Sequence, residues 1–222
     1  MSTRSEAKEW MDLGCYSEKE YRQCLYQLDR IGRYLGGDRA TLSAFDQLKR
    51  PPQSILDVGC GGGLFTRRLA KKYPKAKVVG IDISKEAIEF ANQFKCSNLE
   101  FAVAELNYPA KSFDIITSTL VCHHMTDEGI VLFLKKAYQV ARQGIILNDL
   151  HRHSLAKFGY SIAAPFLFLN RMVLHDGLIS IERGFLRQEW ISYMKLAEIP
   201  FDQITINWNW AFRWIIRVTH GE

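Results

Sequence analysis

The sequence predicts an α/β fold in which helices cover both faces of one mostly parallel sheet. Between residues 54 and 149, short apolar runs alternate with amphipathic segments, and this alternation is typical of parallel strands joined by helices. A glycine-rich turn at residues 59–63 separates an apolar run from an amphipathic one. The chain has 222 residues, 47% of them hydrophobic, which suits one such domain with a small lid.

Residues 5–50 are predicted to be helical. Apolar side chains recur there three or four positions apart, as at Tyr21, Cys24, Leu28 and Ile31, and this spacing places them on one helix face. Gly36-Gly37 ends the run, and Pro51-Pro52 stops any helix and begins a new unit. We therefore expect an N-terminal helical lid at residues 1–50.

The middle of the chain, residues 51–150, is predicted to form the core of the sheet. Five buried strands are expected at 55–58, 77–82, 99–104, 113–118 and 144–149. Helices are expected between them at 64–72, 84–94 and 126–140, with Ser84 and Thr126 as N-caps. This is a Rossmann-like order, and such sheets bind ligands at the carboxyl ends of their strands.

The alternation breaks after the fifth strand. Residues 154–174 form an apolar, helical stretch followed by His175-Asp176-Gly177, and we expect a helical insertion at 151–187 that caps the acceptor. Its apolar side chains either roof a pocket or bury a helix: Leu155, Phe158, Tyr160, Ile162, Phe166, Leu167, Phe168, Met172 and Leu174. A helix and two strands in residues 188–222 should complete a seven-stranded sheet with an antiparallel hairpin.

Composition argues against several classes of protein. The net charge is only +5, and no basic run is interleaved with aromatic residues, so no nucleic-acid partner is expected. The five cysteines are scattered without a C-x-x-C, which argues against a disulfide framework and against a zinc or other metal site. The polar first eight residues are not a secretory signal, and no apolar run is long enough for a transmembrane segment. We expect a cytoplasmic protein.

The glycine turn has the features of a ligand-binding loop. Its glycines run G-x-G-x-G, at Gly59, Gly61 and Gly63, whereas a dinucleotide fingerprint is G-x-G-x-x-G. Asp57 lies two residues earlier, and a carboxylate there would repel a pyrophosphate but attract a cationic ligand. Asp82 ends the second strand, where an acid can accept hydrogen bonds from ribose hydroxyls.

These segments resemble the motifs of class I S-adenosylmethionine-dependent methyltransferases. The resemblance rests on residues 55–63 (ILDVGCGGG), 79–84 (VGIDIS), 104–106 (AEL) and 112–116 (SFDII). Four motifs in the family order imply that the chain binds S-adenosylmethionine and transfers its methyl group.

The resemblance also implies which residues hold the cofactor. They are Asp57, Gly59, Gly61, Gly63, Asp82, Ile83, Glu105, Leu106, Thr117 and Ser118. Glycines would pack under the methionine part, with Asp57 near its ammonium group. Asp82 would bind the ribose and Ile83 the adenine ring, whereas Glu105 would face the adenine amine beside Leu106. Thr117 and Ser118 would lie near the reacting methyl group.

The acceptor side is predicted from histidines and from a second resemblance. His123, His124 and His151 follow the fourth and fifth strands, so each is a candidate catalytic base, although each could equally be structural.

Residues 10–13, 148–152 and 175–185 resemble methyltransferases found beside type III polyketide synthases, and the His-His pair resembles ubiquinone- and menaquinone-biosynthesis methyltransferases. A small lipophilic phenol, quinol or polyketide-like acceptor, methylated on oxygen, is implied. The alternatives are a macromolecule such as tRNA, or cofactor binding without catalysis.

Overall fold

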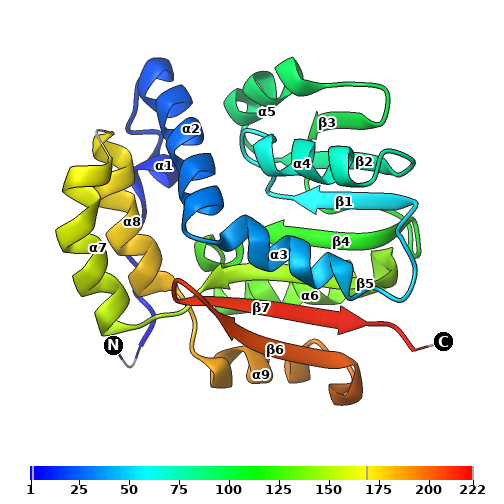
Figure 1. The fold of residues 1–222 in the computed structure, drawn as a ribbon. Helices are drawn as coiled ribbons and strands as arrows, with labels where there is room; N and C mark the ends of the chain where they lie inside the picture. Colours follow the sequence, from blue (N-terminus) through cyan, green and yellow to red (C-terminus); the bar gives the residue numbers. More distant parts are fainter. Residues whose placement is uncertain (2, 169, 222) are drawn as a thin grey trace.

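The predicted sheet is present in a computed structural model that describes residues 1, 3–168 and 170–221. The strand order is β3-β2-β1-β4-β5-β7-β6, with β1 to β5 parallel and β7 antiparallel to both of its neighbours (Figure 1). The strands are β1 (Ser54–Val58), β2 (Lys77–Asp82), β3 (Leu99–Val103), β4 (Phe113–Thr119), β5 (Ala141–Leu150), β6 (Ile204–Asn209) and β7 (Arg213–Thr219). The expected fold class and C-terminal antiparallel hairpin are therefore confirmed.

Two hydrophobic layers bury the sheet on both faces. Ile55 packs with residues of α3 (Gly37–Asp46), α4 (Leu64–Lys72) and α5 (Lys85–Ala91). Its neighbour Leu56 packs on the opposite face with α6 (Asp127–Val140) and α9 (Arg187–Leu196). Successive strand residues point to opposite faces, so a strand covered on both sides is apolar throughout. This explains the unbroken apolar runs of the central strands.

A third layer of helices lies at the carboxyl ends of the parallel strands (Figure 1). It contains α1 (Trp10–Leu13) and α2 (Glu18–Tyr34) from the N-terminus, together with α7 (Ser154–Leu167) and α8 (Arg171–Arg183) from the insertion. Tyr21 and Leu25 of α2 pack with Phe90 of α5 and Met172 of α8. Helices α1 and α2 of the predicted lid and α7 and α8 of the predicted insertion therefore form one layer at the carboxyl edge of the sheet, whereas α3, also within residues 1–50, packs on a face of the sheet.

The prediction of one helical stretch over residues 154–174 was wrong in detail. Asn170 begins a second helix, since its side chain accepts hydrogen bonds from the backbone N–H groups of Met172 and Val173. His175-Asp176-Gly177 lies inside α8 instead of ending a helix. This motif therefore presents side chains from a helix face.

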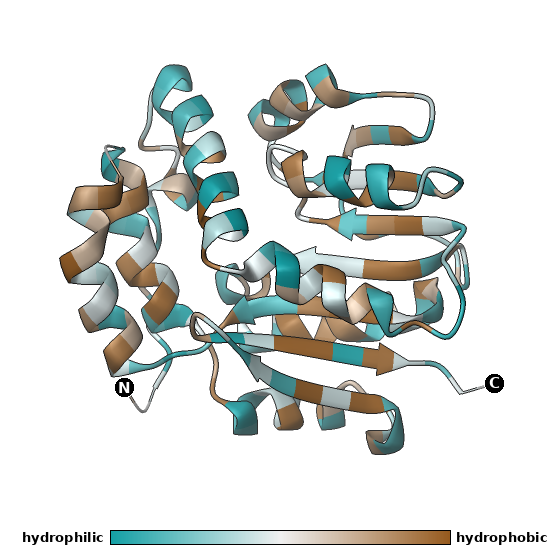
Figure 2. Cartoon of the chain, viewed as in Figure 1, coloured by the Kyte–Doolittle hydropathy of each residue, from teal (hydrophilic) through white to brown (hydrophobic). Residues whose placement is uncertain are grey.

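Several apolar side chains of α7 point to solvent. Phe166 is 87% exposed, and Leu155, Phe158 and Ile162 are exposed as well; Figure 2 shows the corresponding hydrophobic bands along this helix. These four side chains neither roof a buried pocket nor pack against the domain, whereas Met172 is buried and Phe168 packs against the same hydrophobic cluster. Every described helix is too short or too polar to cross a bilayer.

Three short 3₁₀ turns complete the chain, η1 (Asn92–Phe94), η2 (Cys122–His124) and η3 (Phe201–Gln203). η2 follows β4 after two intervening residues, at the carboxyl edge of the sheet. It carries both histidines of the predicted His-His pair.

Candidate active site

The glycine loop between β1 and α4 turns through the left-handed region of backbone space. Gly59, Gly61 and Gly63 have φ angles of 71°, 51° and 70°, which glycine adopts without the steric cost of a Cβ. A Cβ on Gly59 would lie 2.4 Å from Val121, which follows β4, and one on Gly63 would lie 2.5 Å from Phe101. A Cβ on Gly61 would find its nearest neighbour, Leu25 of α2, 4.0 Å away. The backbone is therefore open to a ligand at Gly61.

Asp82 connects this loop to the end of β2. Its Oδ2 accepts a hydrogen bond from the Gly61 backbone N–H (2.8 Å), and its Oδ1 accepts one from the Ser84 N–H (2.9 Å). The next residue, Ile83, is 76% exposed. The carboxylate thus shapes the loop, and an unpaired apolar side chain beside it could pack on a flat ring.

Asp57 is buried at the end of β1, where its Oδ2 accepts a hydrogen bond from the Thr66 hydroxyl (2.7 Å). Burial raises the pKa of Asp57 to about 7, and the negative charge of Asp82 adds to the effect. A carboxyl group in this position gains most from a cationic ligand nearby.

The remaining predicted cofactor residues lie at or near the same edge of the sheet. The Thr117 hydroxyl donates to the Ile146 carbonyl (2.9 Å), and the Ser118 hydroxyl donates to the Val58 carbonyl (2.8 Å). Both side chains are buried and used by the sheet itself. Leu106 is buried in the core, whereas Glu105 is exposed.

His123 and His124 lie together on η2, and a carboxylate orients each ring. His123 Nδ1 is 2.7 Å from Asp149 Oδ1 of β5, and the backbone N–H of His123 donates to the other oxygen of that carboxylate. Burial alone would raise the pKa of Asp149, but the adjacent His123 holds it below its usual value. His124 Nδ1 is 2.9 Å from Asp12 Oδ1. In each histidine, Nδ1 is thus the ring nitrogen that contacts a carboxylate.

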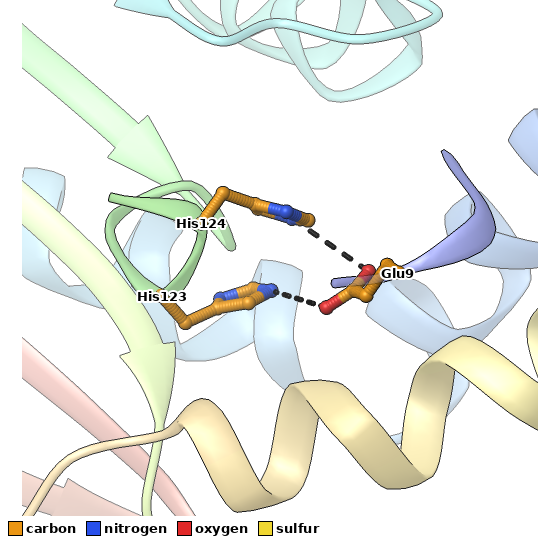
Figure 3. Close-up of side chains that lie close together, drawn as sticks. All are labelled: Glu9, His123 and His124. Atoms are coloured by element: carbon orange, nitrogen blue, oxygen red, sulfur yellow. Dashed lines mark ion pairs between the residues drawn. The ribbon is translucent and has the colours of Figure 1, made fainter. Parts of the chain in front are cut away.

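Glu9, just before α1, completes this histidine–carboxylate cluster. Its Oε1 lies 3.7 Å from His123 Nε2, and its Oε2 lies 3.9 Å from His124 Nε2, with both imidazoles facing the carboxylate in Figure 3. The residue is only 3% exposed, and burial raises its pKa to about 7. We define the histidine–carboxylate cluster as Glu9, Asp12, His123, His124 and Asp149.

The 175–185 motif holds the N-terminal segment against this cluster. Asp176 accepts hydrogen bonds from the backbone N–H groups of Trp10 (2.8 Å) and Met11 (3.1 Å), and the Trp10 ring stacks on His175 at 4.0 Å. Arg183 donates to the carbonyl oxygens of His123 (2.7 Å) and Ala7 (2.8 Å). The segment around Glu9 is therefore fixed by buried polar contacts.

His151 lies apart from this arrangement. Its Nδ1 is 3.1 Å from the indole nitrogen of Trp208 on β6, and burial together with the neighbouring His153 lowers its pKa. Within the described part of the chain, His151 forms no hydrogen bond or ion pair with His123 or His124. Of the three predicted bases, the structure brings only two together.

Sequence reasoning assigned no role to Glu9, Asp12 and Asp149. Asp12 and Asp149 do lie in the segments 10–13 and 148–152 that resemble other methyltransferases, which was the available signal. Glu9 lies one residue outside the first of these segments, 114 positions before His123. Spacing alone does not connect residues so far apart.

Comparison with known proteins agrees with the motifs. Residues 55–144 match a family model described as a methyltransferase domain. A malonyl-[acyl-carrier protein] O-methyltransferase from Legionella pneumophila is 34% identical over 89 residues, which are 38% of this chain and 31% of the relative. A ribosomal protein L11 methyltransferase from Burkholderia multivorans is 39% identical over 119 residues, 50% of this chain and 38% of the relative.

Solved structures extend the likeness over nearly the whole chain. One of them is the plantazolicin methyltransferase BpumL in complex with a monoazolic desmethylPZN analog and SAH. The match covers 96% of this chain and 93% of the BpumL chain, with a TM-score of 0.71 and 17% identity. At that identity the likeness shows the fold. The chain spans less than half the length of the two curated relatives. The match to the methyltransferase-domain family model is thus confined to residues 55–144, and the solved structure shows that the rest of the chain shares the fold.

Proposed function

We propose that this chain binds S-adenosylmethionine and transfers its methyl group to an oxygen of a small lipophilic acceptor. The observation that carries the proposal is the close approach of Gly59 to Val121, since a Cβ on Gly59 would lie 2.4 Å from the Val121 side chain. Val121 lies two residues before His123, so the glycine loop that follows the buried Asp57 lies near the His123–Asp149 pair, which supports the proposal. In this proposal the cofactor and the base lie at the same edge of the sheet.

In this proposal the cofactor lies over Gly61, the open position of the loop. Asp57 lies beneath the loop, where a carboxylate favours the ammonium group of the cofactor. Ile83 packs on the adenine. Asp82, already bonded to two backbone N–H groups, keeps lone pairs for ribose hydroxyls. The remaining predicted cofactor residues, Glu105, Leu106, Thr117 and Ser118, surround the same edge.

The reaction is an in-line displacement in which the acceptor oxygen forms a bond to the methyl carbon as the sulfur–methyl bond breaks. The proton of the acceptor hydroxyl goes to an imidazole nitrogen. With Nδ1 bound by a carboxylate, Nε2 is the free acceptor atom on both His123 and His124. His124 is the better placed to reach an acceptor, because its side chain is 26% exposed whereas that of His123 is 3% exposed.

A small acceptor is supported by the way the site is covered. The N-terminal segment and α8 close over the histidines through Asp176 and Arg183, so a bulky macromolecule would have to displace both. The relatives span different acceptor classes, since one is named for a malonyl-acyl carrier protein and the other for a ribosomal protein. Protein or RNA methylation is therefore the alternative that an experiment must distinguish. We place the reaction in the cytoplasm.

Two measurements test the proposal. Calorimetry should show S-adenosylmethionine binding in the micromolar range and no binding of NAD. Extract incubated with the protein and isotopically labelled cofactor should then yield labelled phenolic or quinol compounds by mass spectrometry. Label found in protein or RNA would overturn the small-acceptor proposal, and cofactor binding with no transfer to any pool would overturn the enzymatic one.

A further inference from the structure

We propose that Glu9, His123 and His124 form a binding site for one divalent transition-metal ion, for which zinc is the probe. One ligand atom from each residue can be chosen so that all three lie within 4.8 Å of one another. Figure 3 shows the three side chains converging from the η2 turn and from the N-terminal segment. The scattered cysteines predict no zinc site, but this site uses histidine and glutamate ligands instead of cysteine.

The distances suit a metal better than a direct hydrogen bond. Glu9 Oε1 and His123 Nε2 are 3.7 Å apart, and Glu9 Oε2 and His124 Nε2 are 3.9 Å apart; both distances exceed those of hydrogen bonds. Ligand atoms about 2.1 Å from a tetrahedral zinc lie roughly 3.4 Å from one another. Only small side-chain movements would bring these atoms onto one ion.

The outer contacts of the three ligands match those of known metal sites. Metal-binding histidines usually donate their second ring N–H to a carboxylate or carbonyl, which fixes the tautomer and ring direction. Here His123 Nδ1 is bound by Asp149 (2.7 Å) and His124 Nδ1 by Asp12 (2.9 Å). Glu9 Oε1 accepts a hydrogen bond from the Ser180 hydroxyl (2.8 Å). All three ligands are thus oriented before an ion arrives.

The set of donor atoms points to the class of metal. Two imidazole nitrogens and one carboxylate oxygen are the ligands of many zinc centres and of other first-row transition metals, whereas magnesium and calcium prefer oxygen alone. Three protein ligands leave at least one coordination position open. The ion would bind the same Nε2 atoms that the proposed base needs, so zinc bound here should block that proton transfer; the ion-binding site itself does not depend on methyl transfer.

Metal binding by the purified 222-residue chain is the test. After treatment with a chelator and desalting, the wild-type protein is titrated with Zn²⁺ by calorimetry, and bound zinc is counted by elemental analysis. We expect one zinc per chain and a rise in the thermal unfolding midpoint on binding. Titration with Co²⁺ should give the visible absorption of a low-symmetry site.

Variants decide whether the bound ion occupies this cluster. Glu9→Gln and His124→Gln each keep a similar shape but lose a ligand, and each should weaken zinc binding at least tenfold. Asp149→Asn changes only an outer contact and should weaken it by about 10- to 100-fold. His220→Ala removes a histidine elsewhere on the fold and should leave zinc affinity unchanged.

Two results would overturn the metal site: less than one zinc per wild-type chain, or equal zinc affinity in the wild type, Glu9→Gln and His124→Gln. Circular dichroism of the metal-free variants identifies any loss caused by misfolding, and Asp12→Asn, at the partly exposed edge of the cluster, provides a further variant that should weaken binding. S-adenosylmethionine affinity is measured on the same samples. Zinc binding without cofactor binding would reject the proposed function and keep the metal site, and the reverse result would reject only the metal site.

Discussion

The proposed cofactor side and the proposed acceptor side of this molecule are built in different ways. On the cofactor side, Asp57, Gly61 and Asp82 lie within 26 consecutive residues, and hydrogen bonds to backbone N–H groups hold the loop in shape. On the acceptor side, Glu9 and Asp12 come from the N-terminus, His123 and His124 from the turn after β4, and Asp149 from β5. The first site depends on local backbone geometry, and the second depends on packing between distant segments.

This difference determines what a substitution should disturb. Changes in the glycine loop should affect either folding or cofactor binding, according to whether a new side chain meets protein atoms or open space. Changes in the contacts that join the N-terminal segment to α8 should affect the acceptor side and leave cofactor binding intact.

The largest effect is expected from Gly59→Val, with Gly61→Val as its matched partner. A side chain at Gly59 meets Val121 at 2.4 Å, so overpacking and left-handed strain should lower the free energy of unfolding by about 3–5 kcal/mol. At Gly61 there is room within the protein, so the valine should cost only the backbone strain of about 1–2 kcal/mol. It should, however, abolish S-adenosylmethionine binding by occupying its space.

Urea unfolding and calorimetry on the two glycine variants check this pair. Unchanged cofactor affinity in a folded Gly61→Val protein would contradict the assignment of the cofactor to this loop.

Asp57→Asn should change how stability depends on pH. The pKa of Asp57 is raised by burial from 3.8 to about 7, so its contribution to stability is complete below about pH 4 and is lost as the pH rises through 7. The wild type should therefore lose roughly 2–4 kcal/mol between pH 4 and pH 8 that the variant does not lose. Asparagine can still accept the Thr66 hydrogen bond.

Urea unfolding of both proteins at pH 4 and pH 8, without cofactor, measures this difference. If the free energy of unfolding changed with pH in the same way in both proteins, burial would not raise the pKa of Asp57. The proposed preference of this site for a cationic ligand would then be unsupported.

Asp176→Ala should loosen the acceptor side alone. Two backbone N–H groups, those of Trp10 and Met11, lose their acceptor, which should cost about 1–3 kcal/mol. Limited proteolysis should then cut the first fifteen residues faster, while cofactor affinity stays within twofold. Asp176→Asn keeps one acceptor oxygen and should give an intermediate cleavage rate; equal rates in all three proteins would contradict the anchoring role.

The smallest effect is expected on the outer face of α7. Phe166 is 87% exposed, so Phe166→Ser should change the free energy of unfolding by less than about 0.5 kcal/mol. Thermal unfolding of the isolated protein checks this value. A loss above about 2 kcal/mol would show that the side chain is covered in solution.

Much of the fold could be predicted from local patterns. Strand β2 and helix α4 have the bounds that their residue patterns indicated, Lys77–Asp82 and Leu64–Lys72, because hydrophobic periodicity reflects which faces are covered. The break between α7 and α8 was missed, since the apolar pattern continues through Asn170 and the cap depends on one side chain. The solvent exposure of Phe166 was missed for a similar reason: an apolar sequence does not reveal whether a neighbour covers it.

The sequence by itself determined the central strands and helices, the glycine loop and its acidic partners, because each depends on residues close together in the chain. Only the tertiary structure decided that Asp176 anchors Trp10, that Asp149 and Asp12 orient the two histidines, and that Glu9 faces both. These contacts join segments more than 20 positions apart, and in several cases more than 100. Their geometry follows from how the N-terminal helices and α8 pack on the edge of the sheet, a result of the whole fold.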